Sequence, residues 1–384
     1  MSKLLNYWPE KAVKCTEIMN KLILIAFNAK IGMKLILDSY RVNFSQYFNL
    51  YVLTDKEYAK GVNDPKIFGI SESGSHIRMA LDVFNIFKMI KIIAIIAREK
   101  KVVIYFISAH PLNAMTAFAV RIINLLPDME LRLISHIHDV TPHANTKNGF
   151  FIDAFQTTQV NLSDHITVYG DYLKSSAKRH FSLPDSKIFS YLHGVNRTIS
   201  RDNLPQSKVG KKFVSLIGRI DKYKGIDIFL DIIAMLEDQL DCEFLLAGYG
   251  DLSPYDEKIK KLKKLNVVNR FLSDDEMDEM LLSSYILVLP YIDASQSGMI
   301  PVAYYNACPV LVSDVGGLPE MVKHGETGFI SPTGEVDVFT EYVKLVVSDS
   351  EVRNSLSKNG FEFYRSYLLW DKIIRDVASY INSL

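Results

Sequence analysis

Hydrophobic and polar positions follow two patterns that alternate along the whole chain. Short apolar runs rich in β-branched residues are separated by longer stretches in which apolar residues recur every three or four positions. The short runs predict buried strands, and the longer stretches predict amphipathic helices. Their alternation is typical of βαβ units that build parallel sheets, so we expect an α/β fold.

Six strands are expected in the first half of the chain, with helical patterns between most of them. The expected strands are Leu22–Phe27, Leu50–Leu53, Val102–Ile107, Leu131–Ser135, His165–Tyr169 and Lys187–Tyr191. The expected helices are Ile77–Arg98, Ala114–Leu126 and Tyr172–His180. A polar stretch without periodicity, Arg197–Lys212, contains Pro205 and Gly210 and predicts a linker.

The second half repeats the alternation after this linker. Strands are expected at Phe213–Ile217, Glu243–Ala247, Val267–Phe271, Tyr285–Pro290 and Val310–Val312. Helices are expected at Gly225–Leu240, Ser253–Leu265, Asp274–Ser283 and after Gly334, the last from about Leu369 to Ser383. With 384 residues, two domains are the default. The pattern therefore predicts two α/β domains with a cleft between them, at 1–205 and 206–365, followed by a C-terminal helix at 366–384.

The composition agrees with a globular protein, since 48% of the residues are hydrophobic and 23% are charged. The net charge is zero, yet the two halves differ. Residues 1–205 hold 25 Lys and Arg against 17 Asp and Glu, and the remainder holds 19 against 27. A basic first half favours an anionic partner such as a membrane surface, and ordinary scatter of surface charge is an equal alternative. No nucleic-acid partner is expected.

Targeting and metal signals are absent from the sequence. The three cysteines show neither a CxxC pair nor zinc-type spacing with histidine, which favours a reduced, cytoplasmic setting. The N-terminus lacks the apolar core of a signal peptide. Asp82, Lys88 and Lys91 interrupt the apolar segment Leu81–Ala97. A spanning helix needs roughly 20 mostly uncharged residues, so we expect a mostly buried amphipathic helix there.

Two successive strand-to-helix turns in the second half predict an anion site. The turn Ser295–Gly298 follows a buried strand, and Pro301 suits the first position of the next helix. The turn Gly316–Gly317 follows the next strand, and Pro319 is expected to open another helix. A helix start presents unpaired amides and the positive end of the helix dipole. Two such starts on adjacent strands suggest a site for a nucleotide diphosphate.

Two more loops of the second half follow strands. Gly218 permits a close turn, Arg219 can donate two hydrogen bonds to a phosphate, and Lys224 adds a point charge. A solvated loop with two surface cations is the plainer alternative. Gly248 and Tyr249 follow the next strand without the third glycine of a dinucleotide-binding motif. This loop could border a nucleotide base or form a tight structural turn.

Histidines end two expected strands of the first half. His110 follows one strand, and His138 follows the next, with Asp139 beside it. A single histidine is more often structural than catalytic, but two on neighbouring strand ends favour at least one functional role. A neutral histidine can donate to a sugar hydroxyl or a phosphate oxygen. His138 and Asp139 lack a third ligand at suitable spacing, so we expect no metal site.

Taken together, these motifs resemble glycosyltransferase family 4, the retaining GT-B enzymes of the glycosyl transferases group 1 type. The resemblance rests on residues 218–225, 245–251, 287–298 and 309–330, which span most of the second half in the order of the family. The first half matches more loosely, through His110 with Pro111, His138 with Asp139, and residues 193–196.

The resemblance implies the GT-B fold: two doubly wound, Rossmann-like domains facing across a cleft, with the C-terminal helix returning to the N-terminal domain. The C-terminal domain would bind a UDP-sugar or GDP-sugar donor, without a further cofactor. Arg219, Lys224 and the amides of Ser297, Gly298 and Met299 would hold the diphosphate, and His110 would contact the transferred sugar or the acceptor hydroxyl. The other implied substrate-binding residues are Gly32, His138, Asp139, Gly218, Gly248, Tyr249, Gln296 and Glu320.

One departure from the family concerns two glutamates in an E-x7-E arrangement. The second of them, which grips the ribose in family members, falls at Val302 here, or at Ala303 with a shift of one residue. Asp293 is the nearest acid and lies out of register, and Glu320 is too far along the chain to replace it simply. The ribose contact must therefore come from elsewhere or be absent.

The resemblance implies a retaining transferase that adds a sugar to a glycan or lipid-linked glycan during surface polysaccharide biosynthesis. We expect it in the cytoplasm, in peripheral contact with the inner face of the plasma membrane. The alternatives are a nucleotide-sugar epimerase or hydrolase on the same scaffold, and a non-catalytic partner subunit of a transferase.

Overall fold

The computed structural model describes most of the chain. The described residues are 20–27, 31–62, 64–71, 85–97, 101–108, 110–127, 129–141, 149–195, 197, 200–205 and 213–384. The expectations for the N-terminal segment, for residues 77–84 of the first long helix and for residues 206–212 of the linker lie outside these residues.

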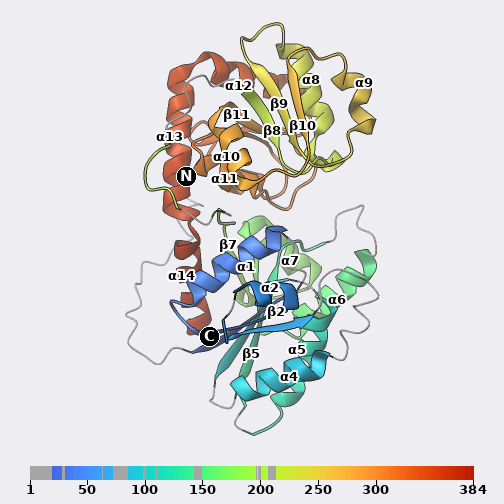
Figure 1. Cartoon of the computed structure of the whole chain (residues 1–384), viewed down its shortest axis with the longest axis vertical. Coiled ribbons are helices and arrows are strands. Elements are labelled where there is room, and N and C mark those ends of the chain that lie inside the picture. Colours follow the sequence, from blue (N-terminus) through green and yellow to red (C-terminus); the bar gives the residue numbers. More distant parts are fainter. Residues whose placement is uncertain are drawn as a thin grey trace. The chain divides into compact units, whose positions relative to one another are not determined.

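The chain divides into two compact units, each with its own parallel sheet (Figure 1). Unit 1 comprises residues 1–191 and 370–384, and unit 2 comprises residues 192–369. Unit 1 contains a seven-stranded sheet in the order β3-β2-β1-β4-β5-β6-β7, and unit 2 contains a six-stranded sheet in the order β10-β9-β8-β11-β12-β13. Both sheets contain the strand order of a doubly wound Rossmann-like fold, which confirms the expected α/β class.

The strands of unit 1 other than β3 carry the predicted apolar runs. They are β1 Lys21–Ala26, β2 Asn49–Asp55, β3 Ile67–Ser71, β4 Val102–Phe106, β5 Leu131–Ile137, β6 His165–Tyr169 and β7 Ile188–Tyr191. Its helices are α1 Ile31–Phe44, α2 Lys56–Val62, α4 Asn85–Ile96, α5 Pro111–Ile123, α6 Gly149–Asn161, α7 Gly170–His180 and α14 Trp370–Ser383. Successive side chains of β1 enter different apolar clusters, because neighbouring residues of a strand face opposite sides of the sheet.

The elements of unit 2 follow the same plan. Its strands are β8 Phe213–Ile217, β9 Glu243–Gly248, β10 Leu265–Asn269, β11 Ser284–Leu289, β12 Val310–Ser313 and β13 Gly328–Ser331. Its α-helices are α8 Ile226–Leu236, α9 Asp256–Ile259, α10 Asp274–Leu282, α11 Met299–Tyr305, α12 Val336–Ser348 and α13 Ser350–Tyr367. Single 3₁₀ turns are formed at Lys222–Lys224, Ser253–Tyr255 and Leu318–Met321.

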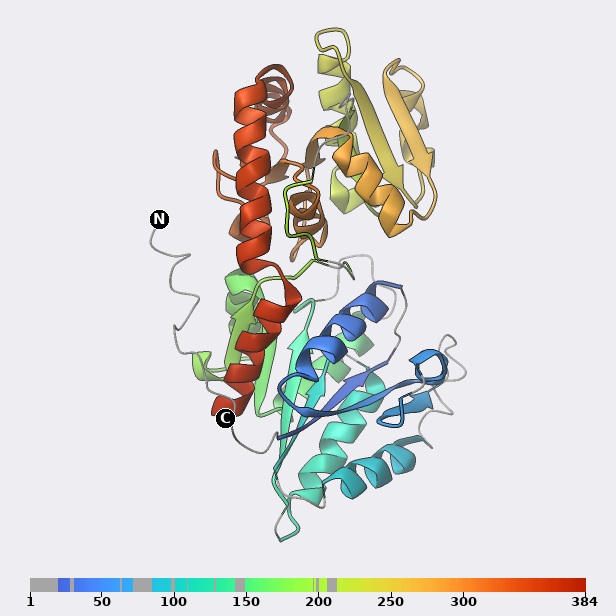
Figure 2. The ribbon, with the colours of Figure 1, turned by 60° about the vertical axis from the view of Figure 1, so that its left-hand side comes forward.

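The C-terminal helix α14 belongs to unit 1, as expected. It packs against α1 and lies along this unit in Figure 2. Its side chains at Trp370, Ile374 and Val377 are buried in the same cluster as Tyr40 of α1, and the rings of Tyr40 and Trp370 lie 5.3 Å apart. The apolar side of this amphipathic helix therefore packs into the core on one face of the sheet of unit 1.

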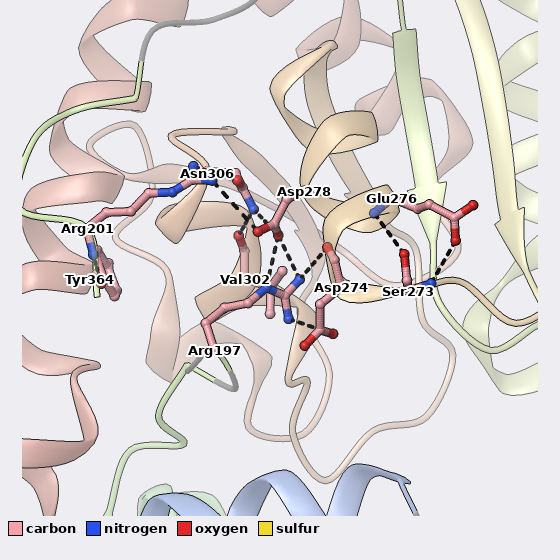
Figure 3. A network of polar contacts seen from close by, with 9 residues as sticks. All are labelled: Arg197, Arg201, Ser273, Asp274, Glu276, Asp278, Val302, Asn306 and Tyr364. Atoms are coloured by element: carbon pink, nitrogen blue, oxygen red, sulfur yellow. Dashed lines mark hydrogen bonds and ion pairs between the residues drawn. The ribbon is translucent and has the colours of Figure 1, made fainter. Parts of the chain in front are cut away.

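The unit boundaries fall at 191/192 and 369/370, where the sequence had suggested 205/206 and 365/366. The described part of the expected linker is bound to unit 2 by buried polar contacts (Figure 3). Arg197 donates to Asp278 at 2.7 Å and pairs with Asp274 at 3.2 Å, with only 6% of its side chain exposed. The amide of Val195 donates to the carbonyl oxygen of Leu368 at 2.9 Å. Composition alone suggested a free linker because it does not report such contacts.

Several expected elements differ from the structure. The helix expected at Ser253–Leu265 is reduced to a 3₁₀ turn and the four residues of α9, because Lys263 and Lys264 donate their amides to Glu237 and direct the chain into β10. Helix α11 begins at Met299, two residues before the position expected from Pro301. The edge strands β3 and β13 were not predicted.

Candidate functional site

The candidate residues of unit 2 lie at the carboxyl ends of its central strands. Strands β8 and β11 are neighbours at the point where the strand order of the sheet reverses. Ligands of open parallel sheets bind at such a point, beyond the carboxyl ends of the strands. The loop with Gly218, Arg219 and Lys224 follows β8, and the loop with Gln296 to Gly298 follows β11. The topology therefore brings the two predicted anion-binding loops to one edge.

The loops after β8 and β9 are bonded to each other. The amide of Gly218 donates to Ala247 at 2.9 Å, and the amide of Ile220 donates to Tyr249 at 3.0 Å. Gly248 has φ +145°, and a Cβ there would lie 1.8 Å from the carbonyl oxygen of Gly218. Only glycine fits this close approach. The structure thus explains why glycine occupies position 248: the loop makes a tight structural turn, which was one of the two interpretations of its sequence.

The loops after β8 and β11 are joined in the same way. Gly225 has φ +71°, and a Cβ there would lie 1.8 Å from the carbonyl oxygen of Pro290. The amide of Ile292 donates to the carbonyl oxygen of Tyr223 at 2.9 Å. This contact fixes the side chain of Lys224 against the residues that follow β11.

Lys224 is held by two aromatic side chains. Its Nζ donates to the hydroxyl of Tyr291 at 2.7 Å, lies 3.9 Å from the centre of that ring, and lies 5.2 Å from the ring of Tyr223. Burial, and to a smaller extent the nearby Arg219, lower the pKa of Lys224 to about 8. No carboxylate of the described residues lies at hydrogen-bond distance from this half-buried ammonium group. It is therefore suited to a mobile anion, because the anion would stabilise the charged form.

Arg219 lies in the same loop but reaches solvent, with 62% of its side chain exposed. Its guanidinium donates to the hydroxyl of Tyr223 at 3.0 Å and lies 3.7 Å from Asp221. An exposed ion pair at this distance is weak, so the guanidinium can exchange Asp221 for a ligand phosphate at low cost. The loop therefore offers one half-buried and one exposed cation.

The turn after β11 presents polar groups near Lys224. Ser297 is buried, its Oγ lies 3.4 Å from the hydroxyl of Tyr291, and it accepts the amide of Met299 at 3.3 Å. Gly298 precedes α11, and the buried ring of His193 lies beside it, 3.6 Å from where a Cβ would stand. Ser297 and Lys224 thus contact the same Tyr291 hydroxyl from two different loops.

The loop after β12, which leads to Glu320, is bonded to the turn after β11 that contains Gln296. The amide of Gly317 donates to the carbonyl oxygen of Ser295 at 3.1 Å, which bonds the Gly-Gly turn to the residue before Gln296. The buried Oε1 of Gln296 has no hydrogen-bond partner among the residues that the structure describes. A buried unpaired amide oxygen is costly, so this atom is a ready acceptor for a ligand donor. Glu320 lies in the 3₁₀ turn that follows, where the sequence had suggested a full helix.

Tyr249 forms a stacked pair with Phe271 at the ends of β9 and β10. The ring centres are 4.5 Å apart with planes at 13°, and both side chains are exposed. Two exposed parallel rings offer an apolar surface on which a planar group can stack. The sequence had indicated Tyr249 but not Phe271.

Val302 does not offer a polar group to this site. It lies in α11 with its side chain buried, and its carbonyl oxygen accepts from the Nδ2 of Asn306 at 2.9 Å (Figure 3). The same Nδ2 donates to Asp278 at 2.8 Å. The position expected for a ribose-binding glutamate is therefore part of the apolar and polar interior of unit 2.

In unit 1, His110 lies at the carboxyl ends of the strands, as the candidate loops do in unit 2. It follows β4, which neighbours β1 at the reversal of strand order. His110 caps α5, and its Nδ1 accepts the amide of Leu112 at 3.2 Å. In the neutral ring this contact leaves the proton on Nε2, the atom that can then donate. The side chain is buried and packs 5.2 Å from the ring of Phe27.

His138 and Asp139 follow β5, the neighbour of β4. The Nε2 of His138 bonds to the carbonyl oxygen of Ile107 at 3.0 Å, so that nitrogen carries the proton. Burial lowers the pKa of His138, while Asp139 opposes this shift, and the ring is neutral near pH 7. Gly32, the remaining candidate, lies in the first turn of α1. The structure thus brings His110 and His138 to adjacent strand ends of unit 1.

Sequence reasoning missed the aromatic side chains that hold the site together. Tyr223 and Tyr291 contact Lys224, and Phe271 stacks on Tyr249. The sequence did contain a signal for them. Tyr291 and Phe271 come shortly after strands, and Tyr223 lies in the loop between Gly218 and Gly225. His193, beside Gly298, also lay in a segment already noted for its resemblance.

The described residues contain neither a metal-binding group nor a membrane-spanning helix. No group of three or more His, Cys, Asp or Glu side chains there could hold a metal ion. None of the helices described is both long and apolar enough to span a bilayer.

Part of the second half of the chain matches a family of known proteins. Residues 200–363 match the family model "Glycosyl transferases group 1". An uncharacterized glycosyltransferase of Methanocaldococcus jannaschii is 27% identical over 257 residues, which cover 66% of this chain and 68% of that protein. A second relative, from Campylobacter jejuni, is GalNAc-alpha-(1->4)-GalNAc-alpha-(1->3)-diNAcBac-PP-undecaprenol alpha-1,4-N-acetyl-D-galactosaminyltransferase. It is 25% identical over 179 residues, 44% of this chain and 49% of its own length. The match thus spans about half of that enzyme.

The similarity of fold extends over most of the chain. The crystal structure of HepE from Anabaena in complex with UDP-glucose superimposes with a TM-score of 0.71, at 14% identity, and covers 95% of this chain and 100% of that one. This likeness confirms the GT-B fold, with two Rossmann-like units built on parallel sheets.

Proposed function

We propose that this chain, a glycosyltransferase with a group 1 domain at residues 200–363, is a retaining enzyme that transfers a hexosyl group from a nucleotide-diphosphate sugar. The observation that carries the proposal is the half-buried Lys224, held against Tyr291 beside Ser297 where the sheet of unit 2 reverses its strand order. The fold neighbour HepE binds UDP-glucose, which supports a nucleotide-sugar donor for the same architecture.

In this proposal the chain stabilises the departing diphosphate. Lys224 and Arg219 supply positive charge as the bond between the sugar and the diphosphate breaks. The amides of Ser297, Gly298 and Met299 donate to the same oxygens. The acceptor hydroxyl attacks the face of the sugar that the diphosphate leaves, and a diphosphate oxygen takes its proton. Cations already fixed in the loop need no rearrangement during this step, which is why they lower the barrier.

The nucleoside is proposed to lie on the loops after β9 and β10. The exposed pair Tyr249 and Phe271 offers a stacking surface for the base, and Gly218 and Gly248 hold together the two loops beside this pair. Gln296 accepts a hydrogen bond from the donor through its unpaired Oε1, and Glu320 follows in the next loop. With Val302 buried, the ribose is held by groups other than the usual glutamate.

The acceptor is proposed to bind unit 1. His110, through Nε2, would donate to the transferred sugar or contact the acceptor hydroxyl, and His138, Asp139 and Gly32 would line the acceptor side. The acceptor is a glycan, and the Campylobacter relative with its undecaprenol-linked substrate supports a lipid-linked one in polysaccharide biosynthesis. Such an acceptor would place the reaction at the cytoplasmic face of the plasma membrane.

Donor binding tests the proposal directly. A ligand that binds only the folded state raises the melting temperature, so UDP-, GDP- and ADP-sugars are compared by thermal shift. We expect a shift with one nucleotide class that Arg219→Ala and Lys224→Ala abolish. Lys222→Ala is the matched control, because Lys222 lies in the same turn with an exposed side chain. No shift with any nucleotide sugar would count against the donor site and favour a non-catalytic partner subunit.

Product analysis separates transfer from the other reactions of this scaffold. The purified chain is incubated with the donor that binds and with membrane lipid extract as the acceptor source. Glycan extension with release of the nucleoside diphosphate is the expected result. Release of free sugar alone would indicate a hydrolase, and an altered nucleotide sugar would indicate an epimerase.

A further inference from the structure

Helices α4, α5 and α6 of unit 1 are consecutive neighbours with apolar side chains on two sides. Helix α4 contacts α5, and α5 contacts α6; Figure 1 shows α4 and α5 side by side. The inner side chains of α4 and α5, such as Met89, Ile93 and Val120, are buried in the cluster that covers the sheet. A surface helix normally carries polar residues on its outer side. These helices carry large apolar side chains on their outer sides as well.

Helix α5 and the turn after it show the departure most clearly. Phe118, Ile122 and Leu126 are exposed and four residues apart, so they form one outward stripe. Leu125 extends the stripe and is 82% exposed. A stripe of four large apolar side chains facing water has an unfavourable hydration free energy unless another apolar phase covers it.

The neighbouring helices continue this surface. We call it the outer apolar surface and define it by Phe87, Ile95, Phe118, Ile122, Leu125, Leu126, Phe150, Phe151, Ile152 and Phe155. These are ten of the nineteen exposed large hydrophobic residues among the described residues. Isolated exposed apolar residues are ordinary, but a concentration on three adjacent helices marks a binding surface.

Lysines accompany the outer apolar surface on α4. Residues 85–97 contain Lys88 and Lys91 and no acid. Lys88 and Lys91 are exposed on α4 between Phe87 and Ile95. On α6, Asp153 is paired with His180 at 2.9 Å.

We propose that the outer apolar surface docks onto an anionic lipid bilayer, with its phenylalanine, leucine and isoleucine side chains in the interfacial region and Lys88 and Lys91 at the lipid phosphates. Apolar and aromatic side chains beside lysine are the combination that binds such a surface. A symmetric contact between two copies of this chain is disfavoured, because the same basic groups would face each other across it.

The surface also reaches the edge of unit 1 that carries the candidate acceptor residues. His110 is the N-cap residue of α5, and the exposed Phe150 and Phe151 lie in the first turn of α6. A bilayer on these helices would therefore lie near the carboxyl ends of β4 and β5. The docking itself does not depend on the proposed transfer reaction, but it would bring a lipid-linked acceptor to this edge.

Vesicle co-sedimentation of the full chain tests the docking. Vesicles of phosphatidylcholine are compared with vesicles that contain about 30% phosphatidylglycerol. We expect binding to the anionic vesicles, and at least about a tenfold loss of affinity in the double variant Phe118→Ser/Leu125→Ser. Lys88→Glu/Lys91→Glu should lower binding to the anionic vesicles by a similar factor.

A control variant keeps the test specific. Val42→Ser/Leu345→Ser removes two exposed apolar side chains from α1 and α12, outside the outer apolar surface, and should bind vesicles as the unmodified chain does. Unchanged vesicle binding of the Phe118 and Leu125 variant, or an equal loss in the control, would overturn the proposal. A second result would also overturn it. In this result the unmodified chain binds no vesicles and sediments as a dimer, and the Phe118 and Leu125 variant sediments as a monomer. The donor-induced thermal shift reports separately on the nucleotide site and is expected to persist in all these variants.

Discussion

Lys224 makes nucleotide binding depend on pH in a way that can be worked out from its surroundings. Burial lowers its pKa to about 8, and the neighbours that act on it are Tyr223, Arg219 and Asp221. The hydroxyl of Tyr291 does not titrate in the same range, because burial raises its pKa to about 12. A diphosphate binds the charged ammonium form and must raise the pKa of Lys224 again. Affinity is therefore greatest well below the pKa of Lys224 and declines as the pH rises through it.

The size of this effect follows from the fraction of charged lysine in the free protein. With a pKa of about 8, about nine tenths of Lys224 is charged near pH 7 and about one tenth near pH 9. The dissociation constant for the nucleoside diphosphate should thus rise about tenfold between these values, which corresponds to about 1.4 kcal/mol. Near pH 8, binding should take up about half a proton per site.

Isothermal titration calorimetry measures both quantities. Titrations of UDP or GDP are run across this pH range, and buffers of different ionisation enthalpy at one pH report the proton uptake. Lys224→Arg should bind with a flat pH profile, because a guanidinium stays charged throughout. Lys224→Met should lower the affinity at every pH and also remove the slope. A flat profile for the unmodified chain, or the same slope in Lys224→Arg, would refute this reasoning.

Three further predictions concern the loops and the interior of unit 2. Gly248→Ala would place a Cβ 1.8 Å from a carbonyl oxygen of the loop after β8. Urea denaturation should therefore show a loss of at least about 2 kcal/mol in unfolding free energy. Gly61→Ala is the control, because a Cβ there meets open space, and it should not lower the unfolding free energy. Phe271→Ala should weaken nucleotide binding by about 1 kcal/mol or more through lost stacking, and equal affinity would count against base binding there. Arg197→Met should cost about 3 kcal/mol in the same denaturation assay, because Asp278 is left with less compensation in a buried position; a loss below about 1 kcal/mol would contradict the role of this pair.

The sequence by itself determined most of the strands and their class. Phe213–Ile217 and His165–Tyr169 coincide with observed strands, because a fully buried strand of a parallel sheet is a continuous apolar run. It also determined that the candidate loops follow strands, and the carboxyl ends of parallel strands share one edge. The edge strands β3 and β13 escaped prediction, while the edge strands β7 and β10 were predicted. A glycine begins β13 and another lies inside β3, and glycine weakens the apolar pattern of a strand.

Only the tertiary structure decided which of these residues meet. Lys224 and Tyr291 are 67 positions apart, and no spacing in the sequence indicates that the hydroxyl of one accepts from the ammonium of the other. The same holds for Arg197 and Asp278, whose pairing binds a segment of linker-like composition into unit 2. Periodicity records which side of an element is buried, since that depends on local geometry alone. Contacts between elements depend on strand order and on close backbone approaches such as Gly225 against Pro290, which exist only once the sheet has formed.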